Sequence, residues 1–308
     1  MKNNECPLVS VIIPTRNRKE LLIRALKSVL CQVYESIEII IVDDNSIDGT
    51  FPEISLKFQE DIGHHKIKIF RNEKLMGNAK TRNIGIRKSN GEYVAFLDDD
   101  DVWLPDKIDK QIKEILQSRV EACFCGTIWV ENDKILKSTI ARNSMISFEN
   151  GGPTSSWLIH RRVFDDIGFF DEKFPANVDG EFLVRLNKNF NTCFVNELLY
   201  IHYYYDLQIS SSKKMKIIGF EKMLKKHKAE FNSCEKSSAY FKLAIFYLFE
   251  EKKRFDYILK SIYYKLHLKN ISLLIIMLFP SKTFSKLMVN KILDFVQYPK
   301  SFAGRYNK

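Results

Sequence analysis

Four consecutive aspartates, Asp98–Asp101, follow the apolar run Tyr93–Leu97. Carboxylates this close together repel one another and raise each other's pKa unless a cation or solvent neutralises them. Carboxylate oxygens are the ligands that Mg²⁺ and Mn²⁺ prefer, and such ions often share their coordination shell with substrate phosphates. The D-x-D spacing therefore predicts a divalent-cation site that holds a diphosphate. The alternative is a solvated acidic turn.

Two further polar clusters, Pro14–Arg18 and Asp43–Asn45, each come directly after a short apolar run. The carboxylates of Asp43 and Asp44 can accept hydrogen bonds from a ribose or a base, or they can form a plain turn or helix cap. The sequence contains neither the G-x-G-x-x-G fingerprint of dinucleotide-binding proteins nor the G-x-x-x-x-G-K-[ST] phosphate loop. The remaining interpretation is a mononucleotide-diphosphate site built from carboxylates and a metal ion.

The elements that must position these clusters alternate between strands and helices. Short apolar runs indicate buried strands, and apolar residues at helical spacing indicate amphipathic helices. We expect strands at 8–13, 37–42, 66–70 and 93–97, and helices at 18–30, 51–58 and 78–89. This order is typical of a parallel sheet with helices on both faces. The carboxyl ends of the strands, where ligands bind, then bring the three polar clusters together.

The second half of the chain shows weaker patterns. We expect helices at 105–117, 161–167 and 179–187, strands at 122–130, 155–160 and 192–195, and only helices from Lys213 onward, including a helical hairpin at 238–250 and 255–269. We therefore divide the chain into residues 1–212, with halves at about 1–105 and 106–212, and a helical extension at 213–308.

The net charge of +10 lies entirely in the extension. Residues 1–212 carry 27 Lys and Arg against 31 Asp and Glu, whereas residues 213–308 carry 21 against 7. A basic helical segment can be a solvated face or can bind an anionic membrane surface. Nucleic acid is not an expected partner, because no nucleic-acid-binding module is visible and the first part of the chain is acidic.

Secretion and membrane insertion are not indicated by the sequence. The six cysteines form neither a CxxC pair nor a regular framework, which favours a reducing compartment. The N-terminus lacks the apolar region of a signal peptide. The most apolar segment, Ile271–Phe279, has nine residues, whereas a spanning helix needs about 20. We expect a cytoplasmic protein that can lie peripherally on the inner face of the cytoplasmic membrane through its basic extension.

Several motifs in this order resemble those of the inverting glycosyltransferases of family 2. The resemblance runs from about Val9 to Ser210 and rests on V-S-V-I-I-P-T-R-N-R (9–18), I-V-D-D-N-S-I-D-G-T (41–50), G-N-A-K-T-R-N-I-G-I (77–86) and G-E-Y-V-A-F-L-D-D-D-D-V-W-L-P-D-K (91–107). Weaker blocks are D-D-I-G-F-F-D-E-K-F (165–174) and V-D-G-E-F-L-V-R-L (178–186). The resemblance implies an α/β protein of the GT-A fold, with a mixed, mostly parallel sheet flanked by helices, before the all-α extension.

The resemblance also implies roles for individual residues. A nucleoside diphosphate sugar, which we expect to be a UDP-sugar, would be bound by the polar clusters and the helix at 78–89, through Pro14, Thr15, Arg16, Asp43, Asp44, Asn83, Asp98 and Asp99. Asp100 would hold Mn²⁺ or Mg²⁺ on the diphosphate. Arg82 and Asn83 either contact the sugar donor or brace the aspartates.

The family's catalytic base lies in a Glu-Asp pair, which here reads Val178-Asp179. By resemblance, Asp179 would be the base, although the preceding glutamate is absent. Asp179 can alternatively cap the helix that follows it, and Glu181 is a second candidate base. The family's Arg and His near the end of the catalytic part are replaced by Tyr203–Asp206. We expect His160, His202 and Trp103 to be structural rather than ligand-binding residues.

The implied reaction is a single displacement with inversion. The base takes a proton from an acceptor hydroxyl, whose oxygen attacks the anomeric carbon while the nucleoside diphosphate leaves. Enzymes of this kind extend bacterial capsule, O-antigen or other surface polysaccharides, so the expected acceptor is a saccharide or a lipid-linked saccharide. The loop 142–156 is expected to determine acceptor specificity. Two alternatives stay open: a non-catalytic GT-A-like binding module, and a haloacid-dehalogenase-type phosphatase with Asp98 as nucleophile, although three strands precede its motif.

Overall fold

The computed structural model describes residues 6–63, 66–132, 134–139, 152–204, 213–249 and 254–278. The chain divides into two compact units. Unit 1 comprises Met1–Glu172 and Val178–Tyr203, and unit 2 comprises Lys173–Asn177 and Tyr204–Lys308. We propose that unit 1 is the catalytic part and that unit 2 is the helical extension together with the short segment Lys173–Asn177.

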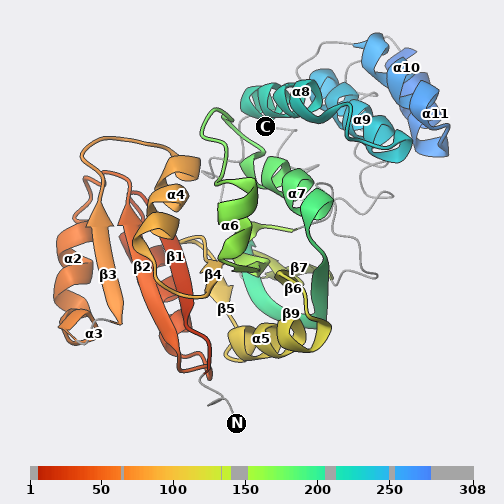
Figure 1. Cartoon of the computed structure of the whole chain (residues 1–308). Coiled ribbons are helices and arrows are strands. Elements are labelled where there is room, and N and C mark those ends of the chain that lie inside the picture. The colour runs from red at the N-terminus through yellow and green to blue at the C-terminus, as the bar shows by residue number, and fades with distance from the viewer. Residues whose placement is uncertain are drawn as a thin grey trace. The chain divides into compact units, whose positions relative to one another are not determined.

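Unit 1 is built on a mixed sheet whose first part is parallel (Figure 1). Its strands lie in the order β3 (Ile67–Arg71), β2 (Ile37–Asp43), β1 (Val9–Thr15) and β4 (Tyr93–Phe96). All residues of β1, β2 and β4 are buried. This burial on both faces explains why these strands are continuous apolar runs in the sequence.

The second part of the sheet is antiparallel. β8 (Leu158–His160) pairs with β4, and β6 (Ala122–Glu131) pairs with β8 and with β7 (Lys134–Thr139). β9 (Thr192–Tyr204) lies next to β6 and pairs with β5 (Val102–Trp103). The expected mixed sheet is therefore confirmed, with its parallel pairs concentrated in the half that carries the polar clusters.

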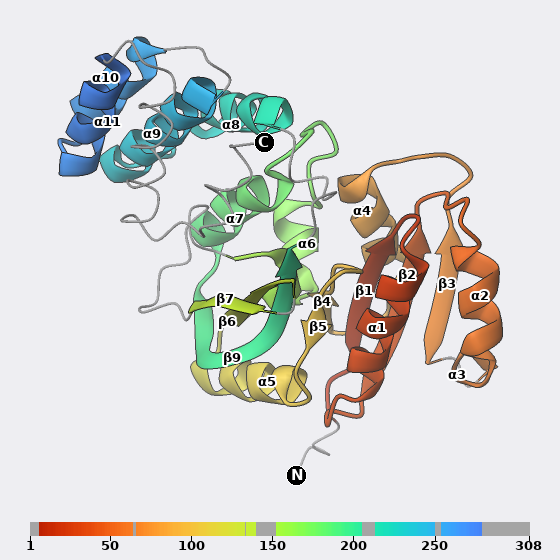
Figure 2. The same ribbon diagram turned by 180° about the vertical axis from the view of Figure 1, so that it is seen from behind.

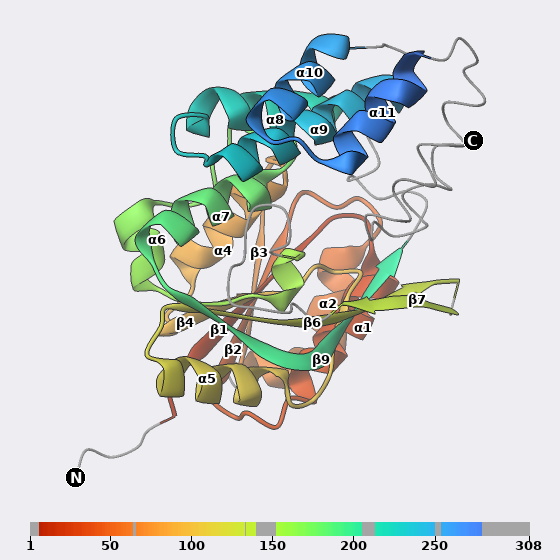
Figure 3. The ribbon, with the colours of Figure 1, turned by 90° about the vertical axis from the view of Figure 1, so that its right-hand side faces the viewer.

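Helices cover both faces of this sheet, as the alternation of side chains along β1 requires. Val9, Val11 and Ile13 pack on α1 (Lys19–Leu30), α2 (Thr50–Lys57) and α5 (Lys107–Ser118). Ile12 points the other way, towards α4 (Asn78–Lys88), α6 (Arg162–Ile167) and α7 (Val178–Asn189). Figure 2 shows α1 in front of β1 and β2, and Figure 3 shows α6 and α7 on one side of the sheet and α5 on the other.

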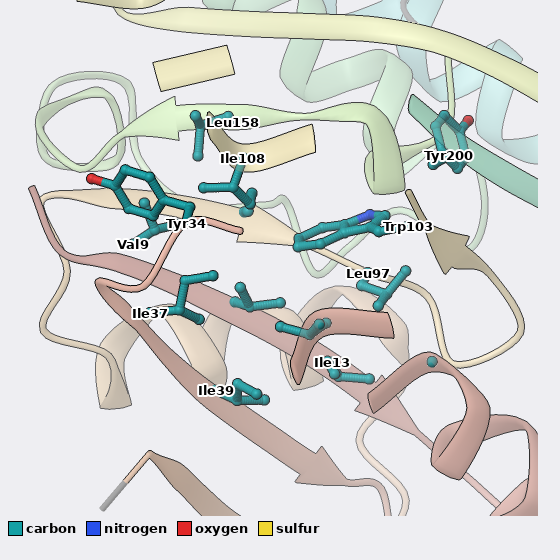
Figure 4. Packing of buried hydrophobic residues seen from close by; sticks show 14 of the residues in the cluster. Val9, Ile13, Tyr34, Ile37, Ile39, Leu97, Trp103, Ile108, Leu158 and Tyr200 are labelled. Atoms are coloured by element: carbon teal, nitrogen blue, oxygen red, sulfur yellow. The ribbon is translucent and has the colours of Figure 1, made fainter. Parts of the chain in front are cut away.

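Trp103 illustrates this packing (Figure 4). Its side chain lies in the core cluster beside Leu97 and Ile13 and is only 2% exposed. Its indole Nε1 donates a hydrogen bond to Ser155 O at 2.9 Å. The expectation that Trp103 is a packed aromatic is therefore confirmed.

Several elements differ from the sequence expectation. The segment 155–160 divides into a 3₁₀ turn, η1 (Thr154–Ser156), and the short strand β8, and β9 extends to Tyr204 rather than ending at Val195. The elements β5, β7 and α3 (Gln59–Gly63) were not expected. They are short or, like β7, largely exposed, so they carry little apolar signal.

Unit 2 contains the helices α8 (Lys213–His227), α9 (Ser233–Phe249), α10 (Phe255–Tyr264) and α11 (Leu268–Leu278). Its core joins the last three helices through Phe241, Ile258, Leu273 and Met277. The expected helical hairpin is confirmed as α9 and α10, and the apolar segment that begins at Ile271 contributes to this core. No helix within the described residues is both long and apolar enough to cross a membrane.

Candidate functional site

The three polar clusters meet at the carboxyl ends of β1, β2 and β4, as the sequence analysis predicts. Thr15, the last residue of β1, donates a hydrogen bond from Oγ1 to Asp99 Oδ2 at 2.8 Å. The backbone N–H of Asp44, just after β2, donates to Thr15 O at 2.9 Å. Parallel strands place their ends side by side, so residues that are 84 positions apart in the chain come into contact.

Arg18 is the counter-charge of the aspartate cluster, a role that the sequence analysis did not assign. Its Nη1 lies 2.9 Å from both Asp99 Oδ1 and Asp100 Oδ2. Both carboxylates are nearly buried, whereas the Arg18 side chain is a quarter exposed. The available signal was the position of Arg18 in the cluster Pro14–Arg18, directly after one strand, in a protein in which another strand, β4, is followed by four aspartates.

Crowding of carboxylates perturbs the titration of this cluster. Burial and the charges of Asp101, Asp98 and Asp99 raise the pKa of Asp100 to about 7, although Arg18 opposes the shift. Burial also raises the pKa of Asp99, against the lowering effect of Arg18 and Thr15. A bound cation would relieve both effects, because it favours the charged carboxylate.

Asp98 is the most accessible member, with 27% of its side chain exposed. Arg82 of α4 forms an ion pair with Asp98 Oδ1 and donates a hydrogen bond from Nη2 to Thr154 Oγ1 at 3.1 Å. Arg82 therefore braces Asp98, one of the two roles left open for it, and its contact with a sugar donor stays a prediction.

Asp101 is completely buried and holds the cluster to the second half of unit 1. Ser155 of η1 donates a hydrogen bond to Asp101 Oδ2 at 2.6 Å and accepts one from the Asp98 backbone N–H at 3.1 Å. His202 of β9 places Nδ1 2.9 Å from Asp101 Oδ1. Burial lowers the pKa of His202, but the carboxylates of Asp101, Asp100 and Asp98 outweigh burial and raise the pKa above its usual value.

Asp179 lies half-buried in the first turn of α7. Burial raises its pKa, while the Gly180 backbone N–H and the charge of Arg82 lower it and the charge of Asp98 raises it. Asp179 therefore belongs to the same electrostatic environment as the aspartate cluster. A carboxylate with a raised pKa is a stronger base than a free one.

Glu181, the second candidate base, is fully buried and engaged with Arg185. The two side chains form a bidentate pair, with Arg185 Nε 2.9 Å from Oε1 and Nη2 2.8 Å from Oε2. Arg185 also donates to the carbonyl oxygens of Gly168 and Phe169. This arrangement favours Asp179 over Glu181 as the base.

Asp43 and Asp44 both organise the loops around the strand ends. Asp44 Oδ1 accepts hydrogen bonds from Asn72 Nδ2 and the Met76 N–H, and its Oδ2 accepts one from the Gly77 N–H at 2.9 Å. Asp43 Oδ1 accepts one from the Ser46 N–H at 2.9 Å. Asp43 Oδ2 is buried and forms an ion pair with Arg71, whose Nε lies 3.7 Å away, but it accepts no hydrogen bond among the described residues. This oxygen can therefore still accept a hydrogen bond from a ligand.

The other predicted donor-binding residues differ in availability. Pro14 is buried on β1 beside Val42, and Arg16 is exposed directly after the strand. Asn83 uses its amide to hold the segment before unit 2, with Nδ2 2.9 Å from Phe170 O and Oδ1 3.0 Å from Phe170 N. Contacts of Pro14, Arg16 and Asn83 with a sugar donor stay predictions.

His160 lies away from the strand ends that form the site. It pairs with Tyr93 at the beginning of β4, whereas the aspartates follow the end of that strand. Its ring packs edge-on against Tyr93, with centroids 5.1 Å apart. The expectation of a structural role for His160 is confirmed.

Of the predicted acceptor loop, residues 142–151 lie outside the described residues.

The residues present fit a divalent ion that is held jointly with a substrate. Within the described ranges, no three side chains of His, Cys, Asp or Glu are gathered as a ready-made metal site. Mg²⁺ is commonly held by one or two carboxylates together with substrate phosphates and water. Asp100, whose pKa is raised by neighbouring carboxylates, and the partly exposed Asp98 supply such hard oxygen ligands.

Sequence comparison finds relatives with related activities. The chain is 31% identical over 134 residues to the UDP-Glc:alpha-D-GlcNAc-diphosphoundecaprenol beta-1,3-glucosyltransferase WfgD of Escherichia coli, a match that covers 44% of this chain and 51% of WfgD. It is 28% identical over 259 residues to the putative colanic acid biosynthesis glycosyl transferase WcaA of Escherichia coli K12, covering 79% of this chain and 88% of WcaA. The chain thus spans about half the length of WfgD and most of WcaA.

Comparison with solved structures finds the same fold at low sequence identity. Staphylococcus aureus TarS 1–349 superimposes with a TM-score of 0.61 at 17% identity, over 94% of this chain and 92% of that one. The mannosyltransferase PcManGT of Pyrobaculum calidifontis, solved with GDP-Man and Mn²⁺, gives 0.60 at 14% identity, over 98% and 86%. These likenesses confirm the GT-A fold.

The family model described as "Glycosyl transferase family 2" matches residues 10–175, which include β1, the strand ends and all four aspartates. This match covers more than half of the chain. The protein therefore belongs to glycosyl transferase family 2.

Proposed function

We propose that this glycosyltransferase moves a sugar from a UDP-sugar to a hydroxyl group of a saccharide or lipid-linked saccharide, with inversion and with the help of Mn²⁺ or Mg²⁺. The observation that carries this proposal is the convergence of Thr15, Asp43 and Asp98–Asp101 at one edge of the sheet. Asp179 lies close enough to this edge for the charge of Asp98 to raise its pKa. The family assignment supplies the reaction class, and the geometry supports the individual roles.

The buried acceptor of Asp43 is compatible with uridine as the base. Asp43 Oδ2 is paired with Arg71 Nε at 3.7 Å but accepts no hydrogen bond among the described residues, so it can accept one from the N–H group of uracil. Thr15 lies opposite Asp43 in the register of β1 and β2, and Arg16 follows it directly, so both are in position for the nucleoside and its phosphates. A crystal structure of TarS contains UDP-GlcNAc, which is consistent with this choice for a protein of the same fold.

The diphosphate would lie against the aspartate cluster. We propose that Asp100 holds the metal ion, with Asp98 and Asp99 towards the ribose and the diphosphate. When bound, Mn²⁺ or Mg²⁺ would stabilise the charge that develops on the leaving diphosphate. Arg18 already neutralises Asp99 and Asp100 and, being a quarter exposed, can contact phosphate oxygens as well.

Asp179 would act as the base. A carboxylate can take the acceptor proton because the proton moves as the bond to the anomeric carbon forms. Burial raises the pKa of Asp179, against the lowering effects of the Gly180 backbone N–H and of Arg82, and a carboxylate with a raised pKa is a better base than an exposed aspartate. A single displacement needs no covalent intermediate, and the sugar configuration therefore inverts.

The acceptor and its location are inferred from the relatives and from charge. The name of WfgD specifies a diphosphoundecaprenol-linked acceptor, and that of WcaA specifies colanic acid biosynthesis. The basic extension, with 21 Lys and Arg against 7 Asp and Glu in 213–308, would favour an anionic membrane surface. We therefore propose work in bacterial surface-polysaccharide synthesis, peripheral to the inner face of the cytoplasmic membrane.

The test is a panel of nucleotide sugars offered with Mn²⁺ or Mg²⁺ and candidate saccharide acceptors, with the anomeric configuration of any product read by NMR. We expect one UDP-sugar to be consumed and the new linkage to have the inverted configuration. Asp179→Asn should lose turnover. Its matched control is Asp165→Asn, which changes an exposed aspartate on α6 and should keep turnover. A product with retained configuration would contradict the mechanism, and consumption of only non-uridine donors would contradict the role of Asp43.

A further inference from the structure

Unit 2 carries a pocket of about 240 Å³ between α8, α9 and α10. The side chains that line it combine lysines, tyrosines, leucines and one carboxylate: Glu221, Leu224, Lys225, Lys228, Tyr240, Leu243, Tyr257 and Lys260. The proposed transferase function uses none of them. Two of the three helices that provide them, α9 and α10, also belong to the packed core of the unit.

Three lysines bring positive charge to this pocket. Lys225, Lys228 and Lys260 are all exposed. The Lys260 Nζ lies 5.5 Å from the ring centroid of Tyr257 and 5.7 Å from that of Tyr240, so its ammonium is held over the tyrosine rings. Interaction with Tyr240 and Tyr264 raises the pKa of Lys228, which remains charged at neutral pH.

A stack of tyrosines forms the apolar wall of the pocket. The Tyr240 ring is nearly parallel to that of Tyr264, at 3° and 5.7 Å, and lies 6.1 Å from that of Tyr257 at 25°. Tyr247 continues the stack beyond Tyr257, at 5.4 Å and 21°. Mutual stacking fixes these rings, so little side-chain entropy is lost when a ligand binds.

The single carboxylate among the lining residues is already engaged. Glu221 Oε1 accepts hydrogen bonds from Tyr247 Oη at 2.8 Å and from Tyr257 Oη at 2.7 Å. Its charge is thus directed at the tyrosine wall. Lys260 Nζ also lies 3.7 Å from Asp256 Oδ2, a carboxylate outside the lining that is already paired with Arg254. The three ammonium groups of the pocket outnumber these two engaged carboxylates, and the remaining excess of positive charge favours a multiply charged anion.

We propose that this pocket binds a phosphate or diphosphate group. Each lysine ammonium is a compact charge with three hydrogen-bond donors, and several of them together suit the tetrahedral oxygens of a phosphate. The tyrosine and leucine side chains suit the carbon skeleton to which the phosphate is attached. This chemistry is shared by soluble phosphorylated sugars and by the headgroups of anionic lipids. The inference does not rest on the transferase activity, because it uses only residues of unit 2.

The test titrates inorganic pyrophosphate and glucose 1-phosphate into the full chain by calorimetry, in EDTA so that no divalent ion bridges the probe to the aspartates. Parallel sedimentation uses vesicles of phosphatidylcholine with or without phosphatidylglycerol. The variant Lys225→Gln/Lys228→Gln/Lys260→Gln removes the pocket charge. Its control, Lys214→Gln/Lys222→Gln/Lys265→Gln, removes the same charge from exposed lysines of unit 2 that do not line the pocket.

We expect the pocket variant to weaken binding by about tenfold or more, and the control variant to change it by less than about twofold. Binding of the soluble probes identifies a free phosphorylated ligand, and binding of phosphatidylglycerol vesicles alone identifies a lipid headgroup. Equal loss in both variants would reduce the effect to net charge and overturn the proposal. Absence of binding to all probes would overturn it as well. Both outcomes leave donor binding at Asp100 untouched.

Discussion

Lys107 and Gln111, one turn apart on α5, provide the sharpest quantitative prediction. Both side chains are completely buried. The Lys107 Nζ donates a hydrogen bond to Gln111 Oε1 at 2.6 Å and lies 4.0 Å from the Trp103 ring centroid. The Gln111 amide in turn donates to Ser156 O at 2.8 Å and to Cys123 O at 3.1 Å. This pair therefore links α5 to η1, the turn that holds Asp98 and Asp101.

The perturbation is a double-mutant cycle with Gln111→Leu and Lys107→Met. Gln111→Leu leaves two buried carbonyl oxygens without their donor and the ammonium without its acceptor, and we expect a loss of about 2–4 kcal/mol in the free energy of unfolding. Lys107→Met keeps the volume while removing a charge that was costly to bury. We expect that variant to stay within about 1 kcal/mol of the wild type.

The coupling between the two substitutions follows from the pKa of Lys107, which burial lowers to about 8. In Gln111→Leu the Lys107 amine can lose its proton. Because the pKa of Lys107 lies about one unit above pH 7, this deprotonation costs about 1.4 kcal/mol at pH 7. The double variant should therefore recover about 1 kcal/mol relative to the sum of the single ones at pH 7. At pH 9, where Lys107 is already neutral, the coupling should fall towards zero.

The lowered pKa of Lys107 also determines how the stability of the wild type changes with pH. The pKa of Lys107 in the folded protein, about 8, lies below the ordinary lysine value of 10.5, so the unfolded chain binds more protons between these pH values. The stability of the wild type relative to Lys107→Met should therefore rise by about 3 kcal/mol between pH 7 and pH 10.5.

Urea unfolding at pH 7, pH 9 and pH 10.5, followed by tryptophan fluorescence, measures these differences. Lys113→Met, an exposed lysine on the same helix, is the control and should change little at each pH. The reasoning would be refuted if the losses in free energy of unfolding of the two single variants simply added in the double variant at pH 7. It would also be refuted if the coupling had the same size at pH 7 and pH 9.

Three further predictions concern the supports of the site. Asp44→Asn should lower the free energy of unfolding by about 1–3 kcal/mol in urea titrations, because an amide N–H replaces the oxygen that accepts from Gly77; an unchanged midpoint would contradict this role. Arg82→Met should weaken donor binding in calorimetry while Arg82→Lys retains more of it, because Asp98 loses its partner; equal affinities of the two variants would argue against bracing. Glu181→Gln should destabilise the chain by about 2–3 kcal/mol, because it breaks a buried bidentate pair, whereas loss of turnover at unchanged stability would make Glu181 the base.

The strand ends could be predicted from the sequence because each buried strand is a local run of apolar residues that is followed directly by a cluster of polar ones. The apolar runs that became β1, β2 and β4 are buried on both faces, and the polar residues after them could only lie at the sheet edge. The aspartate cluster and its meeting with Thr15 followed from topology alone. Trp103 and His160 could likewise be assigned to packing.

Contacts that depend on side-chain direction or on distant segments could not be predicted. Arg18 pairs with aspartates 81 and 82 positions away, and the amide of Asn83 holds Phe170, 87 positions away. No local pattern encodes such partners. Lys107 shows the same limit, because a lysine in an amphipathic helix is normally assigned to the solvent face, whereas here a glutamine one turn later allows it to be buried.

The central claim is that Asp100 binds the donor through a metal ion whereas Asp179 acts only in the chemical step. The direct measurement compares Mn²⁺-dependent UDP binding by calorimetry with donor turnover in the wild type, Asp100→Asn and Asp179→Asn. We predict that Asp100→Asn loses metal-dependent binding, and that Asp179→Asn binds UDP with Mn²⁺ as the wild type does but loses turnover. Metal-dependent binding that survives in Asp100→Asn, or turnover that survives in Asp179→Asn, would contradict the account.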